Sequence, residues 1–210
     1  MKYTLIEDKG NKVEQHKQKN DYWARNGVSV IRSPLPVGDY ILLTDKVQDM
    51  LDRKAKRDKP VKKMDYLGTY DVAVDTKKDI QELVGNVCGD GHDRFRDELI
   101  LAQNNGIKLY ILVQNDFDVV DLKREIVNHT IHRLEDLHSW INPRLWIRDK
   151  KTGKQKYPRA TKGVTLMKAC MTLEKKYGCK FVFCSNVEAG AYVLALLGVA
   201  HDTESRKVSK

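Results

Sequence analysis

The segment DVAVDTKKDIQELVGNV, from Asp71 to Val87, constrains the fold more than any other part of the chain. An apolar strand over residues 71–77 leads directly into a helix whose apolar residues recur at helical spacing. Successive side chains of a strand point to opposite faces of its sheet, so Asp75 and Lys77 share one face and Thr76 lies on the other. The strand–helix unit predicts an α/β fold, and the acid–x–Lys triplet predicts a site for a divalent cation beside a phosphate.

A second acid stands upstream, in the segment LPVGDY. Gly38 allows close approach of the backbone, and Asp39 follows it directly. Magnesium prefers hard oxygen ligands and keeps several waters, so two carboxylates and a backbone carbonyl suffice to bind it. We therefore expect Asp39 and Asp75 to bind Mg²⁺ or Mn²⁺, with the carbonyl of Thr76 as a third ligand. Lys77 is expected to orient the attacking water or to stabilise charge on the phosphate.

Two further pairs of polar residues follow on the predicted helices. Gln81 and Glu82 lie about one helical turn beyond Lys77, and either of them could reach the site. Arg94 and Glu98 are four residues apart and share a helix face, where the cation suits a phosphate and the carboxylate suits a metal or Lys77. A surface ion pair is the alternative interpretation of Arg94 and Glu98.

Apolar strands and helices alternate along the rest of the chain, which predicts a mixed β-sheet flanked by helices on both faces. The expected strands cover residues 3–8, 28–35, 38–43, 71–77, 107–113 and 180–184, and helices are expected near 92–105, 121–139, 164–177 and 187–198. We expect one domain over 1–200, with an inserted basic loop at about 44–70. A short amphipathic hairpin of helices over residues 46–63 is the alternative. A second insertion, a helix plus a basic loop, is expected at about 115–162, and residues 201–210 are expected to form a loose tail.

The net charge of +9 is concentrated in two segments. Residues 46–63 hold eight basic and three acidic residues, and residues 142–162 hold eight basic residues and one acid. Such segments favour a polyanionic partner, whereas a pair of solvated loops is the alternative. The second segment also carries aromatic rings that could stack on bases. The DNA-binding residues predicted there are Arg144, Trp146, Arg148, Lys150, Lys151, Lys154, Lys156 and Arg159.

Several classes of protein are disfavoured by what the sequence lacks. No apolar run approaches the roughly 20 residues of a membrane span, and the first ten residues do not resemble a secretory signal. The four cysteines show no zinc-site spacing, which is typical of reduced thiols. We expect an intracellular protein without a membrane partner.

The residues described above resemble the nuclease domain of the XPF-type structure-specific endonucleases, a branch of the PD-(D/E)xK nucleases. That family reads G-D, a variable gap, and then E-R-K-x-x-x-D. Here the same positions hold Gly38-Asp39, Asp75-Thr76-Lys77 and Gln81. The segment Ile6 to Asp8 resembles the aspartate at the end of the family's first strand, and RFRDE extends the match through Arg94 and Glu98.

The resemblance implies a restriction-endonuclease-like fold and a metal-dependent DNA endonuclease. It is closest to small stand-alone versions from phages and bacteria, which implies a place in the cytoplasm of a bacterial or phage-infected cell. The implied substrate is branched or distorted DNA, in repair, recombination or phage DNA processing. The implied catalytic residues are Asp8, Asp39, Asp75, Lys77, Gln81, Glu82 and Glu98.

Two other functions remain open from the sequence. A catalytically silent DNA-binding or scaffold subunit is one, although retention of Asp39, Asp75 and Lys77 argues against it. A restriction-type nuclease or recombination resolvase on the same core is the other. The chain shows no tandem helix-hairpin-helix, which relatives use to bind DNA and dimerise, so we expect a homodimer through the nuclease domain or an accessory targeting protein.

Overall fold

A six-stranded mixed sheet forms the centre of the computed structural model, which describes residues 3–12 and 16–199. The strand order is β2-β1-β3-β4-β5-β8. The strands are β1 (Thr4–Asp8), β2 (Ser29–Ser33), β3 (Tyr40–Leu42), β4 (Val72–Lys77), β5 (Lys108–Gln114) and β8 (Lys180–Cys184). Only β3 runs antiparallel to its neighbours β1 and β4, while the other pairs are parallel. Strand β4, which carries the acid–x–Lys triplet, therefore lies inside the sheet.

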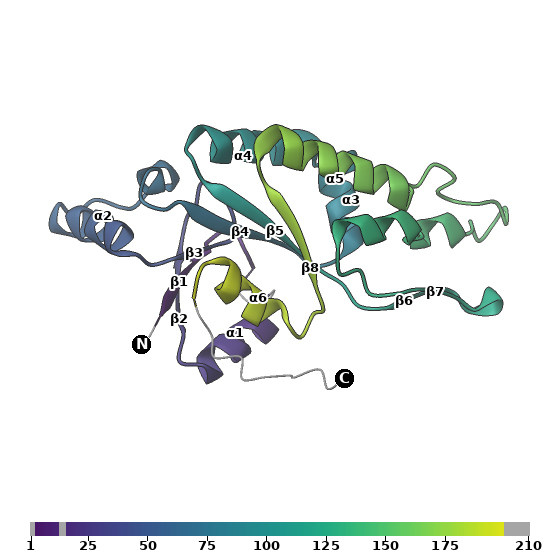
Figure 1. Cartoon of the computed structure of the whole chain (residues 1–210), viewed down its shortest axis with the longest axis horizontal. Coiled ribbons are helices and arrows are strands. Elements are labelled where there is room, and N and C mark those ends of the chain that lie inside the picture. Colours follow the sequence, from purple (N-terminus) through teal and green to yellow (C-terminus); the bar gives the residue numbers. More distant parts are fainter. Residues whose placement is uncertain (1–2, 13–15, 200–210) are drawn as a thin grey trace.

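Helices cover both faces of this sheet (Figure 1). One face packs against α3 (Ile80–Cys88), α4 (His92–Asn104) and α5 (Gly163–Tyr177), and the other against α1 (Lys17–Arg25) and α6 (Ala189–Leu196). Alternation along β5 serves both layers, because Ile111 belongs to the first core and Leu112 to the second. The predicted α/β class, a mixed sheet with helices on both faces, is confirmed. None of the helices in the described residues is long and apolar enough to cross a bilayer.

The first insertion contains two helical segments, so of the two alternatives expected for residues 46–63 the structure bears out the short amphipathic helices and the basic loop is wrong. Helix α2 (Asp45–Lys56) begins where the hydroxyl of Thr44 accepts a hydrogen bond from the amide of Val47, and a 3₁₀ helix follows at Lys63–Tyr66. Val47 and Met50 are buried against the main core, while the basic side chains face outward. An amphipathic pattern thus fixes this segment as a helix.

The helix expected at 121–139 is also wrong, because this stretch forms a hairpin and a 3₁₀ helix. Strands β6 (Asp118–Asp121) and β7 (Ile126–Asn128) pair antiparallel, with Val119 opposite Val127, and the 3₁₀ helix covers Leu134–Ser139. The paired valines are β-branched, and β-branched residues favour strands. Glu125 takes the left-handed conformation (φ 55°) and ends the turn between β6 and β7.

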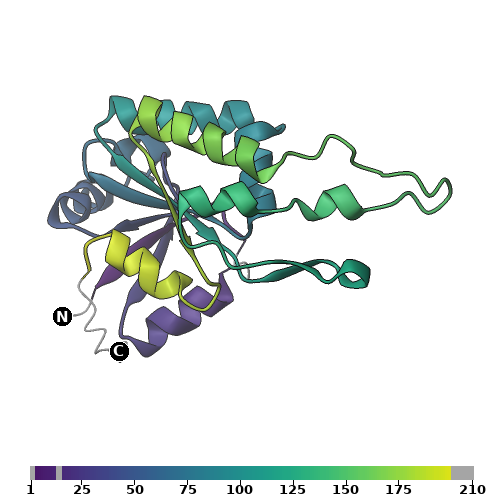
Figure 2. The ribbon, with the colours of Figure 1, turned by 45° about the vertical axis from the view of Figure 1, so that its right-hand side comes forward.

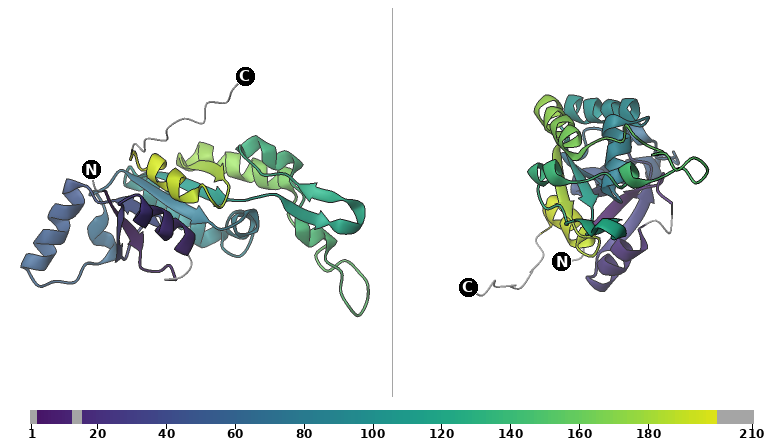
Figure 3. Two further views of the ribbon diagram at one scale, coloured as in Figure 1. Left: turned by 90° about the horizontal axis from the view of Figure 1, so that it is seen from below. Right: turned by 90° about the vertical axis from the view of Figure 1, so that its right-hand side faces the viewer.

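Beyond this hairpin the chain forms a projecting basic segment. A short 3₁₀ helix at Pro143–Trp146 and a bridge between Arg148 and Gln155 shape residues 142–162, which we call the basic arm. The hairpin and the basic arm both extend beyond the sheet (Figures 2 and 3). The domain boundaries expected from the sequence stay a prediction, and the tail expected at 201–210 lies outside the described residues.

Candidate active site

Strand β4 places Asp75 and Lys77 together on one face of the sheet. Both side chains are buried, and Nζ of Lys77 lies 2.6 Å from Oδ2 of Asp75. Nζ of Lys77 also lies 5.2 Å from the ring centroid of Phe95 on α4. Apart from Lys77, no described residue donates a hydrogen bond to Oδ2 of Asp75. The pair expected from strand alternation is thus formed in the structure.

Asp39 reaches this pair from the turn before β3. Oδ2 of Asp39 accepts hydrogen bonds from the amide (2.8 Å) and the hydroxyl (2.6 Å) of Thr76, and Oδ1 accepts one from the amide group of Asn11 (3.2 Å). The turn requires glycine at residue 38, because φ is +76° and a Cβ there would lie 2.9 Å from Cβ of Ala73. Gly38 therefore permits the close approach that brings Asp39 onto β4.

Glu98 joins the site from α4. Its Oε1 accepts a hydrogen bond of 2.8 Å from the amide of Gly38, so the same carboxylate holds the turn that carries Asp39. Arg94 lies one turn earlier on α4, is exposed, and lines the same pocket. The structure thus brings Glu98 and Arg94 to the site and shows no ion pair between them.

Asp8 has a bonding pattern different from that of Asp39. Its Oδ1 accepts from the amide of Leu35 (2.8 Å) and its Oδ2 from the amide of Gly10 (3.1 Å). Asp8 lines the pocket, but both of its oxygens hold loop backbone, which favours a structural role at the end of β1.

The two residues of α3 separate in the structure. Glu82 lines the pocket, although its Oε2 accepts a hydrogen bond of 2.9 Å from the amide of Lys78. Gln81 does not line this pocket and lines three neighbouring cavities instead. Of the two residues that could reach the site, Glu82 therefore lies at the catalytic pocket and Gln81 does not.

The pocket formed by these residues has a volume of about 520 Å³ and an excess of negative charge. Six acids and three bases line it, namely Asp8, Asp39, Asp75, Glu82, Asp97 and Glu98 with Lys63, Lys77 and Arg94. Burial raises the pKa of Asp75 and of Glu98. Burial alone would lower the pKa of Lys77, but the surrounding carboxylates, Asp75 foremost, outweigh burial and raise it. An added cation would stabilise the ionised carboxylates of this pocket.

The donor chemistry fits a hard divalent ion. Asp39 and Asp75 offer carboxylate oxygens, and the carbonyl of Thr76 is a further oxygen ligand of the kind that magnesium takes. No three His, Cys, Asp or Glu side chains within residues 3–12 and 16–199 are grouped closely enough to enclose an ion. The assignment of Asp39, Asp75 and Thr76 as metal ligands therefore stays a prediction.

Of the residues predicted to bind DNA, Arg94 lines the catalytic pocket, and the others occupy the basic arm outside it. Trp146 is half-buried and its ring lies 4.7 Å from the guanidinium carbon of Arg124. Arg144 lines a cavity that adjoins the catalytic pocket. The other predicted residues are exposed: Arg148, Lys150, Lys151, Lys154, Lys156 and Arg159.

Three residues at the site were missed by sequence reasoning. Asn11 bonds Asp39, Phe95 lies under Lys77, and Lys63 reaches the pocket from the first insertion. No local pattern marks Asn11 or Lys63, because their positions depend on how distant segments pack.

Comparisons with known proteins show similarity to a protein family and to a solved structure. The model of a family described as the ERCC4 domain matches residues 11–197. A search of the curated proteins found no match. Among solved structures, XPF from Aeropyrum pernix in complex with DNA is similar at 13% sequence identity and a TM-score of 0.49. That alignment covers 94% of this chain and 64% of the other, so the chain spans less than two thirds of that protein's length.

Proposed function

The chain belongs to the ERCC4 domain family, and on that premise we propose that it is a divalent-metal-dependent DNA endonuclease that cuts branched or distorted DNA. The expected resemblance to an XPF-type nuclease domain is confirmed by the family match. One observation carries the proposal. Asp39, Asp75 and Lys77 come from two separated segments and meet in one acidic pocket.

Asp39, Asp75 and the carbonyl of Thr76 would hold Mg²⁺ or Mn²⁺. The ion would supply a Lewis acid that polarises the phosphoryl oxygen and lowers the pKa of the attacking water. The hydrogen bonds from Thr76 fix the orientation of the Asp39 carboxylate, and Glu98 fixes the turn behind it. These contacts preorganise the ligands before substrate arrives.

Lys77 would act directly on the phosphate or the water. Its amine is charged, because the surrounding carboxylates raise its pKa, and Asp75 and the Phe95 ring fix its position. From there it could donate a hydrogen bond to a phosphate oxygen, which stabilises the charge that builds up in the transition state. Arg94, at the rim of the same pocket, could hold a neighbouring phosphate.

The partner is DNA, contacted through the two basic segments. Helix α2 and the basic arm present exposed lysines and arginines at the two ends of the molecule's long axis, with the sheet between them (Figures 1 and 3). Phosphate contacts of this kind supply affinity without reading sequence, which suits an enzyme that recognises DNA shape. A homodimer or an accessory targeting protein remains our expectation for how such a domain is delivered to DNA.

A cleavage assay tests the proposal. Labelled flap, fork, four-way junction, linear duplex and single-stranded DNA would each be incubated with and without Mg²⁺ or Mn²⁺. We expect metal-dependent cutting of at least one branched DNA and a loss of at least 100-fold in the Asp75→Asn variant. Asp93→Asn is the matched control, because Asp93 is exposed and pairs with Arg96 outside the pocket.

Other outcomes would point elsewhere. Cutting that survives Asp75→Asn would overturn the site assignment. DNA binding without cutting on every substrate would instead favour the silent scaffold subunit. Cutting of linear duplex in preference to every branched DNA would favour a restriction-type enzyme.

A further inference from the structure

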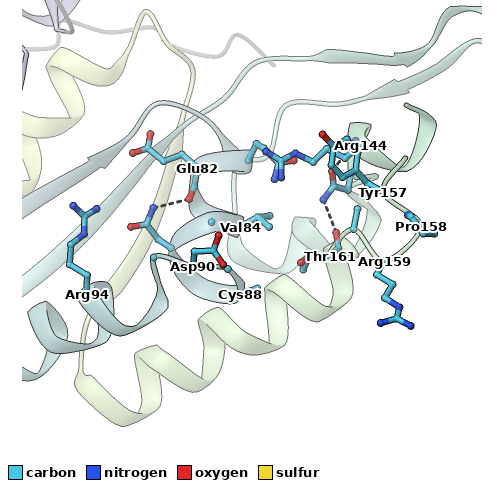
Figure 4. Close-up of a pocket in the computed structure, with 17 residues that line it drawn as sticks. Glu82, Val84, Cys88, Asp90, Arg94, Arg144, Tyr157, Pro158, Arg159 and Thr161 are labelled. Atoms are coloured by element: carbon cyan, nitrogen blue, oxygen red, sulfur yellow. Dashed lines mark hydrogen bonds between the residues drawn. The ribbon is translucent and has the colours of Figure 1, made fainter. Parts of the chain in front are cut away.

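A second cavity adjoins the catalytic pocket, between the α3–α4 turn and the basic arm. Its volume is about 700 Å³. Residues of α3, α4 and their connection line one side, and Arg144, Tyr157, Pro158, Arg159 and Thr161 line the other (Figure 4). Glu82 and Arg94 line both this cavity and the catalytic pocket. The two spaces therefore share part of their lining.

The lining of this cavity differs in charge and chemistry from the catalytic pocket. Three arginines, Arg94, Arg144 and Arg159, outnumber the acids Glu82 and Asp90, so the lining is net positive. Tyr157 is 36% exposed, and two cations lie near its ring: the guanidinium carbon of Arg144 at 5.6 Å and Nζ of Lys156 at 5.5 Å from its centroid. Guanidinium groups bind phosphate and aromatic rings stack on bases, so this lining suits a nucleotide.

The size and the ring together favour an unpaired nucleotide over a duplex. Pockets of about 300–1,000 Å³ hold small-molecule ligands, and a double helix is far too wide for such a space. In a duplex the faces of the bases are covered by their neighbours, whereas an unpaired base can stack on a side chain.

The wall on the side of the basic arm is fixed by hydrogen bonds. Asn142 is 1% exposed, its Nδ2 donates to the carbonyl of Thr161 (3.0 Å), and its Oδ1 accepts from the amide of Arg144 (3.0 Å). One buried side chain thus joins the outgoing and returning strands of the arm. Arg144 and the residues around Thr161 are held in place at the cavity before any ligand enters.

A glycine in the lining of the cavity has open space where a side chain would lie. Gly85 lies inside α3, and a Cβ built on it would meet nothing within 4 Å. Glycine inside a helix costs about 0.5–1 kcal/mol relative to alanine, so the fold alone favours a side chain here. The missing side chain leaves the α3 side of the cavity open.

We propose that this cavity binds one unpaired nucleotide of the DNA strand that enters the catalytic pocket. The inference rests on the proposed nuclease function and extends it. The preferred substrate then carries a single-stranded branch next to the cut, with a base on Tyr157 and phosphates on Arg144 and Arg94.

Binding of a fluorescein-labelled octamer of thymidine, measured by anisotropy on the full chain, tests the inference. Gly85→Gln places a side chain in the cavity, and Tyr157→Ala removes the ring. We expect each variant to weaken octamer binding by about 5- to 100-fold, the effect of losing one stacked base. Ile100→Gln on α4 and Tyr192→Ala on α6 are the matched controls, because both residues are 36% exposed and neither lines the cavity. Gly85→Ala adds a milder change that should raise the melting temperature.

The outcomes separate this inference from the proposed function. Octamer binding that is unchanged in folded Gly85→Gln and Tyr157→Ala variants would overturn the inference, even if the enzyme cuts DNA. Weakened octamer binding in a protein that cuts no DNA would support the cavity and overturn the nuclease. If Gly85→Gln does not fold, the test rests on Gly85→Ala and Tyr157→Ala. Unchanged affinity of both variants for the octamer would then overturn the inference.

Discussion

Thr76 acts on the site through Asp39, in addition to its predicted role as a ligand. Its hydroxyl donates the shorter of the two hydrogen bonds that Oδ2 of Asp39 accepts from this residue. Thr76→Val keeps the shape of the side chain and the backbone carbonyl but removes this donor. A hydrogen bond to a charged group contributes about 1.5–3 kcal/mol, so we expect the Mg²⁺ concentration for half-maximal cleavage to rise at least tenfold.

The maximal rate of Thr76→Val at saturating Mg²⁺ should stay within a few-fold of the parent. Thr172→Val is the control, because the hydroxyl of Thr172 donates to the carbonyl of Lys168 on exposed α5. A variant whose metal titration matches that of the parent would show that Thr76 does not position Asp39.

His16 makes the stability of the fold depend on pH. Its side chain is buried against Tyr40, and its Nε2 has no hydrogen-bond partner in the described residues. Burial first, and then the charges of Lys19 and Arg32, lower its pKa from 6.5 to about 4, against the effect of Asp39. Between pH 6.5 and about 4 the unfolded chain binds a proton that the native state does not bind. Stability therefore falls as the pH falls through this window, by up to about 3 kcal/mol.

Chemical denaturation at a series of pH values measures this effect. His16→Gln should flatten the dependence of the unfolding free energy on pH between about 4 and 6.5, whereas exposed His138→Gln should leave it unchanged. An equal slope in the parent and in His16→Gln would show that His16 is protonated in the native state as readily as in the unfolded chain.

At the scale of elements, the turn between β2 and β3 depends on Gly38. Gly38→Ala would meet both a left-handed backbone (φ +76°) and a Cβ contact of 2.9 Å with Ala73. Gly106→Ala is a matched control, because it has a similar backbone (φ +67°) and nothing within 4 Å of its Cβ. The left-handed conformation costs about 1–2 kcal/mol in both variants, and crowding adds about 1–3 kcal/mol at residue 38 alone.

Thermal and denaturant unfolding of the two glycine variants would measure this difference. We also expect Gly38→Ala to lose cleavage activity, because the displaced turn carries Asp39 and the amide that Glu98 binds. Equal losses of stability in the two variants would mean that Ala73 yields freely and that the turn does not fix the site.

Elements with a strong local period were predictable from the sequence, and elements determined by packing were not. Strand β4 and helix α3 follow from alternation and from the cap at Asp79, whose Oδ1 accepts from the amide of Glu82. Residues 121–139 carry charged and apolar residues that also fit a helix, yet cross-strand pairing of Val119 with Val127 decides for a hairpin. The pairing partner is set by the turn at Glu125, which a periodicity count does not detect.

The candidate site likewise contains residues that a local sequence pattern predicts and residues that only the tertiary fold brings to it. Asp39, Asp75 and Lys77 are recognisable because glycine–acid and acid–x–Lys are compact patterns in the sequence. Asn11 contacts Asp39 across 28 residues and Gly38 contacts Glu98 across 60, so these bonds depend on the tertiary fold. The cavity against the basic arm likewise requires segments 84–94 and 142–161 to meet.

At the scale of the whole molecule, positive charge lies at both ends and negative charge in the catalytic pocket between them. Exposed Arg53, Lys56 and Arg57 belong to the α2 end, and Arg148, Lys150 and Lys151 to the basic arm (Figures 1 and 3). If one DNA molecule contacts both ends, each set neutralises its own phosphates. Because the two sets share no partners, their contributions to the binding free energy should add.

Binding to a forked DNA over a range of salt concentrations tests this arrangement. Replacing either set of three by alanine should reduce the slope of log affinity against log salt by up to about 2.7, and the six-residue variant should lose the sum. Alanine at Lys168, Lys175 and Lys176 of α5, which lines neither cavity, is the control. A slope that responds to only one set would mean that DNA leaves the catalytic pocket toward that end alone. The basic arm also forms one wall of the second cavity. If the salt slope responds to the α2 set alone, the duplex binds on the α2 side, and the unpaired strand would lie on the opposite side, along the basic arm.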